Sequence, residues 1–345
     1  MKQGISGYLP QISAFEIFMK PIKGTVNWGI IGCGDVCEVK SGPAFNKVDH
    51  SKLVAVMRRD AAKAEDYARR HGVPKFYSDA AQLINDPEVN AIYIATPPSS
   101  HELHMLDAMK AGKPVYVEKP VTIHADSCKR MIAMSKQFDM SCSVAHYRRG
   151  LPLFNRVKAL IKEGAIGNVR LVRLSTLQPE KSKLINHTAD NWRVIPEFSG
   201  GGLFHDLSPH QLDIVYWIFG PPKEFNGRSL NQSQKYEAPD VTMLDAVYDS
   251  DVYLNGVWAF NVAESVAQDS CEIIGDKGML RFAFFRKSAI EMTTSSGTEV
   301  LEFDYPVNIQ EPMIAAVTKF FRGEGENPCS LEEALIIMTM MDSTR

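Results

Sequence analysis

The first part of the chain, from Val26 to about Tyr147, alternates short hydrophobic runs with segments whose apolar residues recur at helical spacing. This alternation predicts parallel strands joined by crossover helices. The hydrophobic runs are almost continuous, as expected for strands covered by helices on both faces. The predicted strands are Val26–Ile31, Lys52–Met57, Ala91–Ala95, Pro114–Val117 and Ser141–Val144. The predicted helices are Ala61–His71 and His101–Ala111, which Gly72 and Gly112 terminate.

After Tyr147 the pattern changes. A helix is predicted over Leu153–Glu163, then a long strand over Asn168–Leu177, then a polar irregular stretch through Ser199. Several β-rich runs separated by turn residues predict a second, mostly antiparallel sheet. These runs are Val241–Tyr248, Val252–Phe260, Ser270–Ile274 and Met279–Phe285. A last helix, 330–342, is predicted to begin after a Ser330 cap.

Composition narrows the class of protein. A length of 345 residues suggests about two domains, and 45% hydrophobic with 23% charged residues is typical of a globular protein. The net charge of −3 and the absence of a long basic run argue against nucleic acid and membrane partners. The six cysteines form no paired C-x-x-C motifs, so they are interpreted as reduced, mostly buried thiols of a cytoplasmic protein.

A Gly-x-Gly turn follows the first predicted strand and precedes a predicted helix. Gly32 would allow the tight turn, and Gly34 would let the backbone approach a pyrophosphate at the amides of the helix N-terminus. Cys37 replaces the third glycine of the usual fingerprint, which weakens the match. This context predicts dinucleotide binding, although an ordinary turn between strand and helix would show the same glycines.

Two arginines follow the second predicted strand, where proteins that bind NAD usually carry an acidic residue. Arg58 and Arg59 offer charged, planar donors that suit a 2′-phosphate. They favour NADP(H) over NAD(H) as the cofactor. The alternative is that both arginines are solvated at a helix start, where Asp60 acts as the cap.

Glu118-Lys119-Pro120 ends another predicted strand. The carboxyl edge of an open α/β sheet is where ligands bind, so Lys119 is predicted to point toward the ligand from a stiff backbone element. A single lysine is more commonly a solvated surface charge.

The segment from Gly200 to His210 is the second candidate for chemistry. Asp206 and His210 are four residues apart, so on a helix they share a face, and a carboxylate beside an imidazole can orient a general acid or base. Pro209 would fit a helix that begins near Ser208 or bends there. A capping Asp with a buried structural His would also explain this spacing.

Together, four motifs resemble the Gfo/Idh/MocA oxidoreductase family: the Gly-x-Gly turn, Ala95-Thr96-Pro97, Glu118-Lys119-Pro120, and the glycine triplet followed by Asp206 and His210. The resemblance spans nearly the whole chain from Val26. It implies a Rossmann domain over residues 25–146, after an extension over 1–24, and an α/β domain over 147–345 for substrate binding and oligomerisation. The last helix could pack back on the Rossmann domain.

The resemblance also implies the activity and the site. Family members usually oxidise or reduce sugars, cyclitols and related polyols with NAD(P), as homo-oligomers whose open sheet forms the interface. By this likeness Lys119, Asp206 and His210 are the catalytic residues. The cofactor residues are expected to be Gly32, Gly34, Asp35, Val36, Arg58, Arg59, Thr96, Pro97, His101, Glu118 and Lys119. Tyr147, Arg148, Trp192 and Arg193 are expected to bind substrate together with the catalytic residues.

Two further points concern chemistry that the sequence does not favour. His101-Glu102-Leu103-His104 lacks the H-E-x-x-H spacing of a zinc protease, so no metal site is predicted there, and His187 is a weaker metal candidate still. A binding protein or regulator of the same fold that has lost catalysis is the competing class, because fold alone does not fix function. The presence of Lys119, Asp206 and His210 together favours the enzyme.

Overall fold

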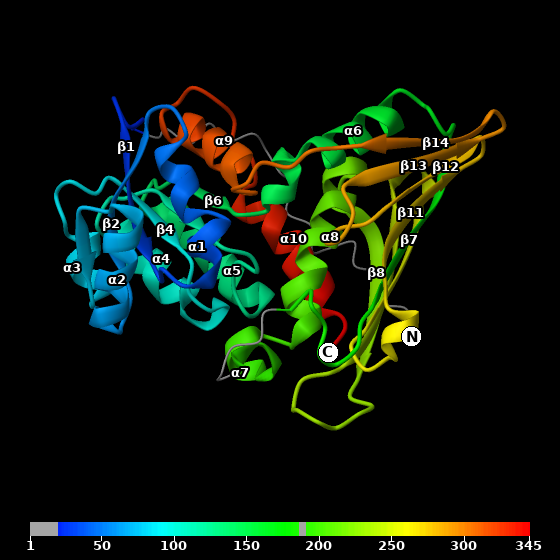
Figure 1. Cartoon of the computed structure of the whole chain (residues 1–345), viewed down its shortest axis with the longest axis horizontal. Helices are drawn as coiled ribbons and strands as arrows, with labels where there is room; N and C mark the ends of the chain where they lie inside the picture. The colour runs from blue at the N-terminus through cyan, green and yellow to red at the C-terminus, as the bar shows by residue number, and fades with distance from the viewer. Residues whose placement is uncertain (1–19, 186–190) are drawn as a thin grey trace. The chain divides into compact units, whose positions relative to one another are not determined.

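The computed structural model describes residues 20–185 and 191–345 (Figure 1). His187 and most of the N-terminal extension therefore lie outside the described residues. The chain divides into two compact units. One holds the described residues through Gly150 together with Pro306–Leu335, and the other holds Leu151–Tyr305 together with Ile336–Arg345.

A six-stranded parallel sheet in the order β3-β2-β1-β4-β5-β6 forms the centre of the first unit. Its strands are β1 (Val26–Ile31), β2 (Ser51–Met57), β3 (Lys75–Tyr77), β4 (Ala91–Ile94), β5 (Val115–Val117) and β6 (Cys142–Val144). All residues of β4, β5 and β6 are buried, because helices cover the sheet. The strand order reverses between β1 and β4, which is the point where doubly wound sheets bind their ligands.

The helices of this unit begin and end at residues suited to those positions. The α-helices are α1 (Asp35–Val39), α2 (Ala61–His71), α3 (Ala80–Ile84), α4 (His101–Lys110), α5 (Ala125–Gln137) and α9 (Glu311–Phe321), and 3₁₀ turns cover Gly42–Asn46 (η1), Pro98–Ser100 (η2) and Tyr147–Gly150 (η3). The Asp60 carboxylate caps α2 by accepting from the Lys63 amide at 3.2 Å, and Gly72 ends it at φ +64°. The cap interpretation of Asp60 is therefore confirmed.

The segment 306–335 returns from far along the chain to the parallel-sheet unit. Phe321 of α9 packs its ring 5.5 Å from that of Trp28 on β1. The loop before α10 (Leu331–Asp342) also contacts β6, since the Val144 amide donates to the Cys329 carbonyl at 2.9 Å. The parallel-sheet unit therefore consists of two separate stretches of the chain, and the second stretch, Pro306–Leu335, lies beyond residue 147.

An eight-stranded sheet in the order β14-β13-β12-β11-β7-β10-β9-β8 forms the second unit. Its strands are β7 (Val169–Leu177), β8 (Pro222–Leu230), β9 (Val241–Tyr248), β10 (Tyr253–Ala259), β11 (Gln268–Gly275), β12 (Gly278–Phe282), β13 (Ala289–Thr294) and β14 (Gly297–Glu302). All neighbouring pairs are antiparallel except β7 with β10, which are parallel. The predicted Rossmann-type sheet and mostly antiparallel second sheet are thus confirmed.

Helices cover one face of this second sheet. In Figure 1, α6 (Pro152–Lys162) and α8 (Leu203–Phe219) lie along it, and α7 (Pro196–Ser199) precedes α8. Short 3₁₀ turns cover Trp192–Val194 (η4), Asp249–Asp251 (η5) and Glu264–Val266 (η6). Burial alternates along the central strands: in β7 and β10 the residues facing the helices are buried and those between them are more exposed.

Some predicted elements required correction. α8 begins at Leu203 and not near Ser208, so Pro209 lies inside the helix. Pro209 lacks an amide hydrogen and cannot donate to the carbonyl one turn earlier. The pattern also gave no prediction for β8, β13, β14, α5 and α9, which the structure contains.

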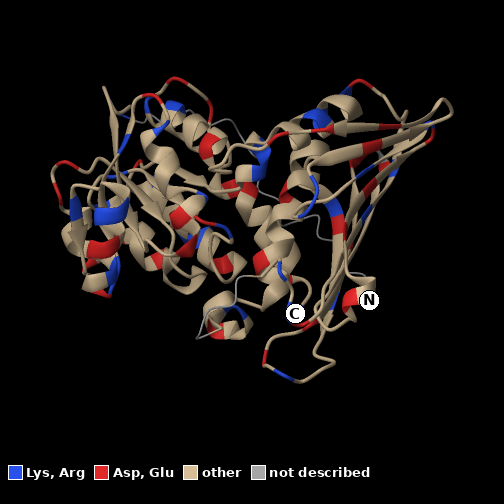
Figure 2. Ribbon diagram, in the orientation of Figure 1, with Lys and Arg blue, Asp and Glu red and all other residues tan. Residues whose placement is uncertain are grey.

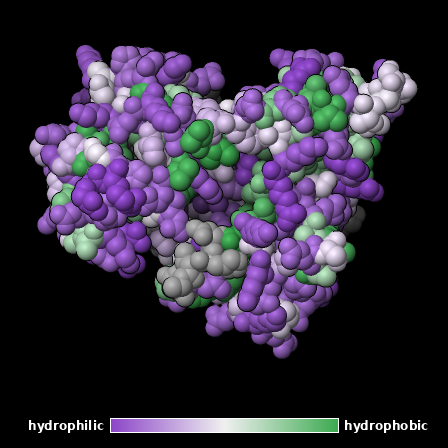
Figure 3. Space-filling view, in the orientation of Figure 1, coloured by the Kyte–Doolittle hydropathy of each residue, from purple (hydrophilic) through white to green (hydrophobic). Residues whose placement is uncertain are grey.

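Surface properties agree with the composition. Lys and Arg are interspersed with Asp and Glu on the ribbons of Figure 2. On the face shown in Figure 3, hydrophobic residues form separate patches among polar ones. All six cysteines are buried and free. Within the described ranges, no helix combines the length and the hydrophobicity needed to cross a bilayer.

Candidate active site

The Gly-x-Gly turn after β1 requires glycine at its first position. Gly32 has φ +92°, and a Cβ there would lie 2.9 Å from the backbone nitrogen of Thr96, which follows β4. Gly34 differs, because a Cβ on it would meet only the Gly32 carbonyl oxygen, at 3.9 Å. Gly32 is thus required by the fold, whereas the space beside Gly34 is available to a ligand such as a pyrophosphate.

Cys37 is accommodated at the position of the fingerprint's third glycine. Its side chain is fully buried, and its sulfur lies 3.8 Å from the Gly32 carbonyl oxygen. Burial raises the pKa of this thiol well above its usual range, so it stays protonated. Asp35 is exposed and Val36 half-buried in the first turn of α1, which is only five residues long.

Arg58 and Arg59 extend from the end of β2. Arg58 is half-buried and Arg59 is exposed. Burial raises the pKa of Cys33 to about 11, and the positive charge of Arg58 opposes this rise. Arg59 acts similarly on His104 of α4, whose pKa is lowered by burial and further by this arginine. The two guanidinium groups therefore place positive charge near the glycine turn and near α4.

His101, at the start of α4, connects two turns at the carboxyl edge of the sheet. Its ring is fully buried, with Nε2 2.7 Å from the Thr96 carbonyl oxygen and Nδ1 3.1 Å from that of Val121. Burial lowers its pKa to about 4. Both ring nitrogens face backbone oxygens, so this histidine ties the turn after β4 to the segment after Pro120.

Glu118 and Lys119 stand directly after β5. Glu118 is buried, and its Oε1 accepts from the Tyr93 hydroxyl at 2.6 Å and from Gln310 Nε2 at 2.7 Å. Its Oε2 lies 3.2 Å from the Lys119 amide, which donates to it. Lys119 is half-buried, and the peptide bond to Pro120 is cis. The structure thus surrounds Glu118 with donors from β4 and from the loop before α9, which sequence reasoning did not identify.

Tight backbone contacts fix the start of α8. Gly200 and Gly202 have φ +87° and +81°, and a Cβ on Gly201 would lie 2.2 Å from the His205 ring. The Ser199 hydroxyl accepts from the Gly202 amide at 3.0 Å. Glycine is therefore needed to bring the chain into this helix.

Asp206 and His210 lie one turn apart on α8, as predicted. The Asp206 carboxylate forms an ion pair with Arg193, whose Nε donates to Oδ2 at 3.1 Å. The Arg193 guanidinium also stacks over the Trp192 ring, 4.5 Å from its centroid. His210 is 6% exposed, and its ring lies 5.8 Å from that of Phe285. The second unit therefore brings together Trp192, Arg193 and Asp206, three of its predicted site residues.

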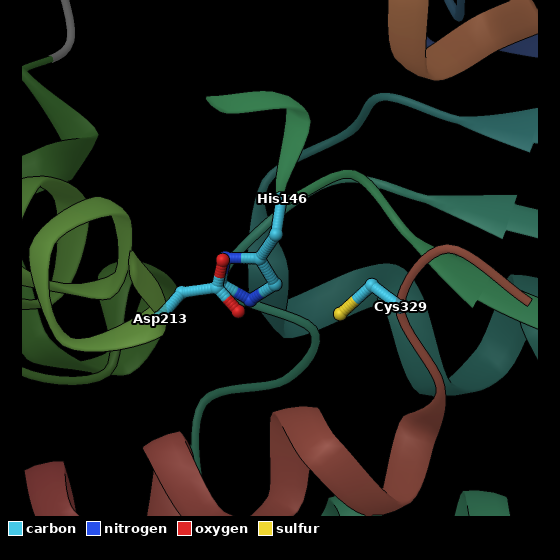
Figure 4. Close-up of side chains that lie close together, drawn as sticks. All are labelled: His146, Asp213 and Cys329. Carbon is cyan, nitrogen blue, oxygen red and sulfur yellow. The ribbon is translucent and has the colours of Figure 1, made fainter. Parts of the chain in front are cut away.

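Tyr147 and Arg148 follow β6 in the 3₁₀ turn η3. Both are buried, at 5% and 4% exposure, and the Arg148 guanidinium carbon lies 5.3 Å from the Tyr147 ring centroid. The same unit places His146 just before them. A ligand atom of His146 lies within 4.8 Å of the Cys329 sulfur, and Figure 4 labels both side chains. Two donors from one unit are fewer than the three or four protein ligands of a typical zinc site.

The fold and the glycine turn are typical of a dinucleotide-binding protein, and comparison with known proteins defines the family. Residues 26–146 match the model of the oxidoreductase family with an NAD-binding Rossmann fold, and residues 154–281 match the GFO/IDH/MocA C-terminal domain. The chain belongs to the GFO/IDH/MocA family and is an NAD(P)-dependent oxidoreductase. The predicted family is thus confirmed.

Two relatives and one solved structure are similar to this chain. Oxidoreductase P35 of Formosa agariphila is 40% identical over 321 residues, which cover 93% of this chain and 98% of the relative. A 1,5-anhydro-D-fructose reductase of Ensifer adhaerens is 24% identical over 317 residues, 89% of this chain and 92% of the relative. Levoglucosan dehydrogenase in complex with NADH and levoglucosan shares the fold, with a TM-score of 0.79 at 21% identity over 92% of this chain and 96% of that one.

Proposed function

We propose that this oxidoreductase interconverts a hydroxyl and a carbonyl group on a sugar, cyclitol or related polyol, with NADP(H) favoured over NAD(H). The observation that carries the proposal is the presence of all three candidate catalytic residues: Lys119 after β5, and Asp206 and His210 one turn apart on α8. The similarity to a 1,5-anhydro-D-fructose reductase supports a sugar-like substrate.

Each catalytic residue has a distinct role in the proposed reaction. The nicotinamide, when bound, accepts or donates the hydride. His210 takes the proton of the substrate hydroxyl during oxidation and returns it during reduction. The Lys119 ammonium polarises the same oxygen as negative charge develops on it. Asp206 orients the substrate, and its ion pair with Arg193 holds the carboxylate in place.

The cofactor site is proposed along the carboxyl edge of the parallel sheet. Gly34 leaves open space for the pyrophosphate, and Asp35 and Val36 contribute the following backbone. Arg58 and Arg59 are proposed to bind the 2′-phosphate of NADP. The remaining cofactor residues are Gly32, Thr96, Pro97, His101, Glu118 and Lys119; of these, His101 contributes by holding the turn after β4.

Besides the catalytic residues, four side chains are proposed to bind the substrate: Tyr147, Arg148, Trp192 and Arg193. Aromatic rings next to guanidinium groups suit a polyhydroxylated ligand, because the rings stack on C–H faces and the guanidinium groups donate to hydroxyls. Both pairs have this composition, Tyr147 with Arg148 and Trp192 with Arg193.

In keeping with this assignment, residues 25–146 would bind the dinucleotide and 147–345 the substrate, in a cytoplasmic homodimer or homotetramer. The face of the eight-stranded sheet opposite its helices is the proposed interface, because it exposes large apolar side chains between polar ones. These are Leu230, Met243, Tyr253 and Val300, 43–53% exposed. Sedimentation analysis of Met243→Asp tests the interface, and an assembly size unchanged from wild type would contradict it.

A spectrophotometric assay tests the activity. Absorbance at the nicotinamide band is followed with NADP(H) or NAD(H) and a panel of sugars, inositols, anhydrosugars and their keto forms. The expected result is turnover that falls about a hundredfold or more in Lys119→Met and His210→Ala, with higher kcat/KM for the NADP form. Cofactor binding without turnover across the panel would instead favour a sensor or regulator and reject the enzymatic assignment.

A further inference from the structure

The Glu118 carboxylate is held by donors from three separate parts of the chain. One oxygen accepts from the Tyr93 hydroxyl of β4 and from the Gln310 side-chain amide, at 2.6 and 2.7 Å, and the other accepts from the Lys119 amide at 3.2 Å. Tyr93 and Gln310 are fully buried, and Glu118 is 6% exposed. Hydrogen bonds to a carboxylate in such a site are stronger than those between neutral groups.

Gln310 reaches this position because its segment docks on the end of α1. The Gln310 amide donates to the Lys40 carbonyl at 3.1 Å, and Asn308 Nδ2 donates to the Val39 carbonyl at 2.5 Å. Gln310 is 192 residues from Glu118 in sequence, yet its side-chain nitrogen donates to the Glu118 carboxylate. The Asn308 side chain anchors the same segment through the Val39 carbonyl, whereas the Gln310 side chain binds the Glu118 carboxylate. Substitutions at the two positions can therefore distinguish loss of anchoring from loss of the contact with Glu118.

The geometry allows Gln310 to influence Lys119 without touching the substrate. Glu118 precedes Lys119 directly, and its own amide donates to the Ile94 carbonyl at 2.9 Å, so the Glu118 backbone is fixed on the β4 side. The carboxylate then fixes the next peptide, because Oε2 accepts from the Lys119 amide. A change in the Gln310 contact would therefore shift the backbone that presents the Lys119 ammonium.

We propose that Gln310 is a positioning residue: by donating to the Glu118 carboxylate, it orients Lys119 for the reaction. The proposal rests on the proposed function, in which Lys119 polarises the substrate oxygen. It also predicts that the Tyr93 hydroxyl and the Gln310 side-chain amide can be replaced only by groups that still donate a hydrogen bond to the Glu118 carboxylate.

Gln310→Glu is the most informative substitution, because it preserves size and makes the donor titratable. A protonated Glu at 310 can donate to Glu118, whereas an ionised one would place two carboxylates in one buried site and repel it. The ratio of kcat in Gln310→Glu to wild-type kcat, at saturating cofactor, is expected to fall at least about tenfold between about pH 5.5 and pH 9. In Gln310→Leu the ratio is expected to be reduced and independent of pH.

Asn308→Leu is the matched control, because it removes a side-chain hydrogen bond from the same segment but none from Glu118. Its kcat ratio to wild type is expected to stay flat with pH and within about twofold of one. A flat ratio in Gln310→Glu as well would overturn the positioning role, and so would a pH-dependent ratio in Asn308→Leu.

Two measurements do not depend on turnover. The Tm of Gln310→Glu is expected to fall relative to that of Gln310→Leu as pH rises, because the new carboxyl binds its proton more tightly in the folded chain than in the unfolded one. Lys119 can be acylated by an amine-reactive reagent and its labelling followed by peptide mass spectrometry. The rate of labelling is expected to change at least about threefold in Gln310→Leu and not in Asn308→Leu. Parallel Tm curves, or unchanged Lys119 labelling, would reject the proposal. Failure of the wild type to turn over any panel substrate would reject the proposed function, while these two measurements still decide the role of Gln310.

Discussion

The two compact units place their candidate site residues by different means. In the parallel-sheet unit, Gly32, Arg58, Thr96 and Lys119 each follow a different strand, and backbone conformation and turn contacts hold them. In the other unit, Asp206 and His210 occupy one face of α8, and a side-chain ion pair to Arg193 holds the carboxylate. A substitution that strains a turn of the first unit, such as one at Gly32, should therefore disturb folding and cofactor binding together. On α8, chemistry can be removed while the fold remains.

The largest effect is expected on α8. His210→Ala should lower kcat by about two to four orders of magnitude, because the general acid and base is lost. Cofactor affinity should remain close to the wild-type value, since His210 lies on α8 and not in the glycine turn. Rapid kinetics with fluorescence titration of NADPH measures both quantities. A parallel loss of cofactor binding would contradict this expectation, because it would show that a substitution on α8 also disturbs the cofactor site.

The glycine turn offers a matched pair of substitutions in the first unit. Gly32→Ala should cost about 1–3 kcal/mol in the free energy of unfolding and also weaken cofactor binding, because the positive φ and the contact with the Thr96 backbone both oppose a Cβ. Gly34→Ala has neither obstacle and should leave stability within about 0.5 kcal/mol of wild type. Its cofactor Kd should still rise about tenfold if the pyrophosphate occupies the adjacent space. Urea unfolding combined with cofactor titration distinguishes the two, and equal destabilisation by both variants would contradict this interpretation.

Cofactor choice provides a smaller effect at the end of β2. The double variant Arg58→Ala/Arg59→Ala should lower the ratio of kcat/KM for NADPH to that for NADH about 10–100-fold, because charge-assisted hydrogen bonds to the 2′-phosphate are lost. Lys63→Ala removes a nearby exposed positive charge from α2, 62% exposed, and serves as the control. An unchanged ratio in the double variant would mean that both arginines are only solvated.

The smallest effect concerns pH and His101. Its pKa in the folded chain, about 4, lies below the ordinary value of about 6.5, so the unfolded chain binds the proton first as pH falls. The stability linked to the neutral ring is complete above about pH 6.5 and is lost as pH falls toward 4. At about pH 5.5 the loss should be about 1 kcal/mol. Urea unfolding at several pH values should show this slope in wild type and a shallower one in His101→Gln. Equal slopes would assign the acid sensitivity to other groups.

Sequence patterns predicted the local elements well where the apolar residues follow a single periodicity, either that of a helix or that of a strand. β1, α2 and β9 match their predicted bounds residue for residue. β8 and β14 escaped prediction because their exposed, polar residues lack a continuous hydrophobic run. Pro209 inside α8 shows the opposite case, in which burial of a long apolar helix outweighs the local preference of one residue.

The sequence by itself determined the family, the glycine turn and the identity of the candidate catalytic side chains, because each depends on residues close together in the chain. Only the tertiary structure decided which distant groups hold them. The parallel pairing of β7 with β10 and the ion pair of Arg193 with Asp206 depend on how the chain folds back. The return of Gln310 to Glu118 has no local signal at all. Such contacts arise from packing over long sequence separations, and neither helical nor strand periodicity encodes them.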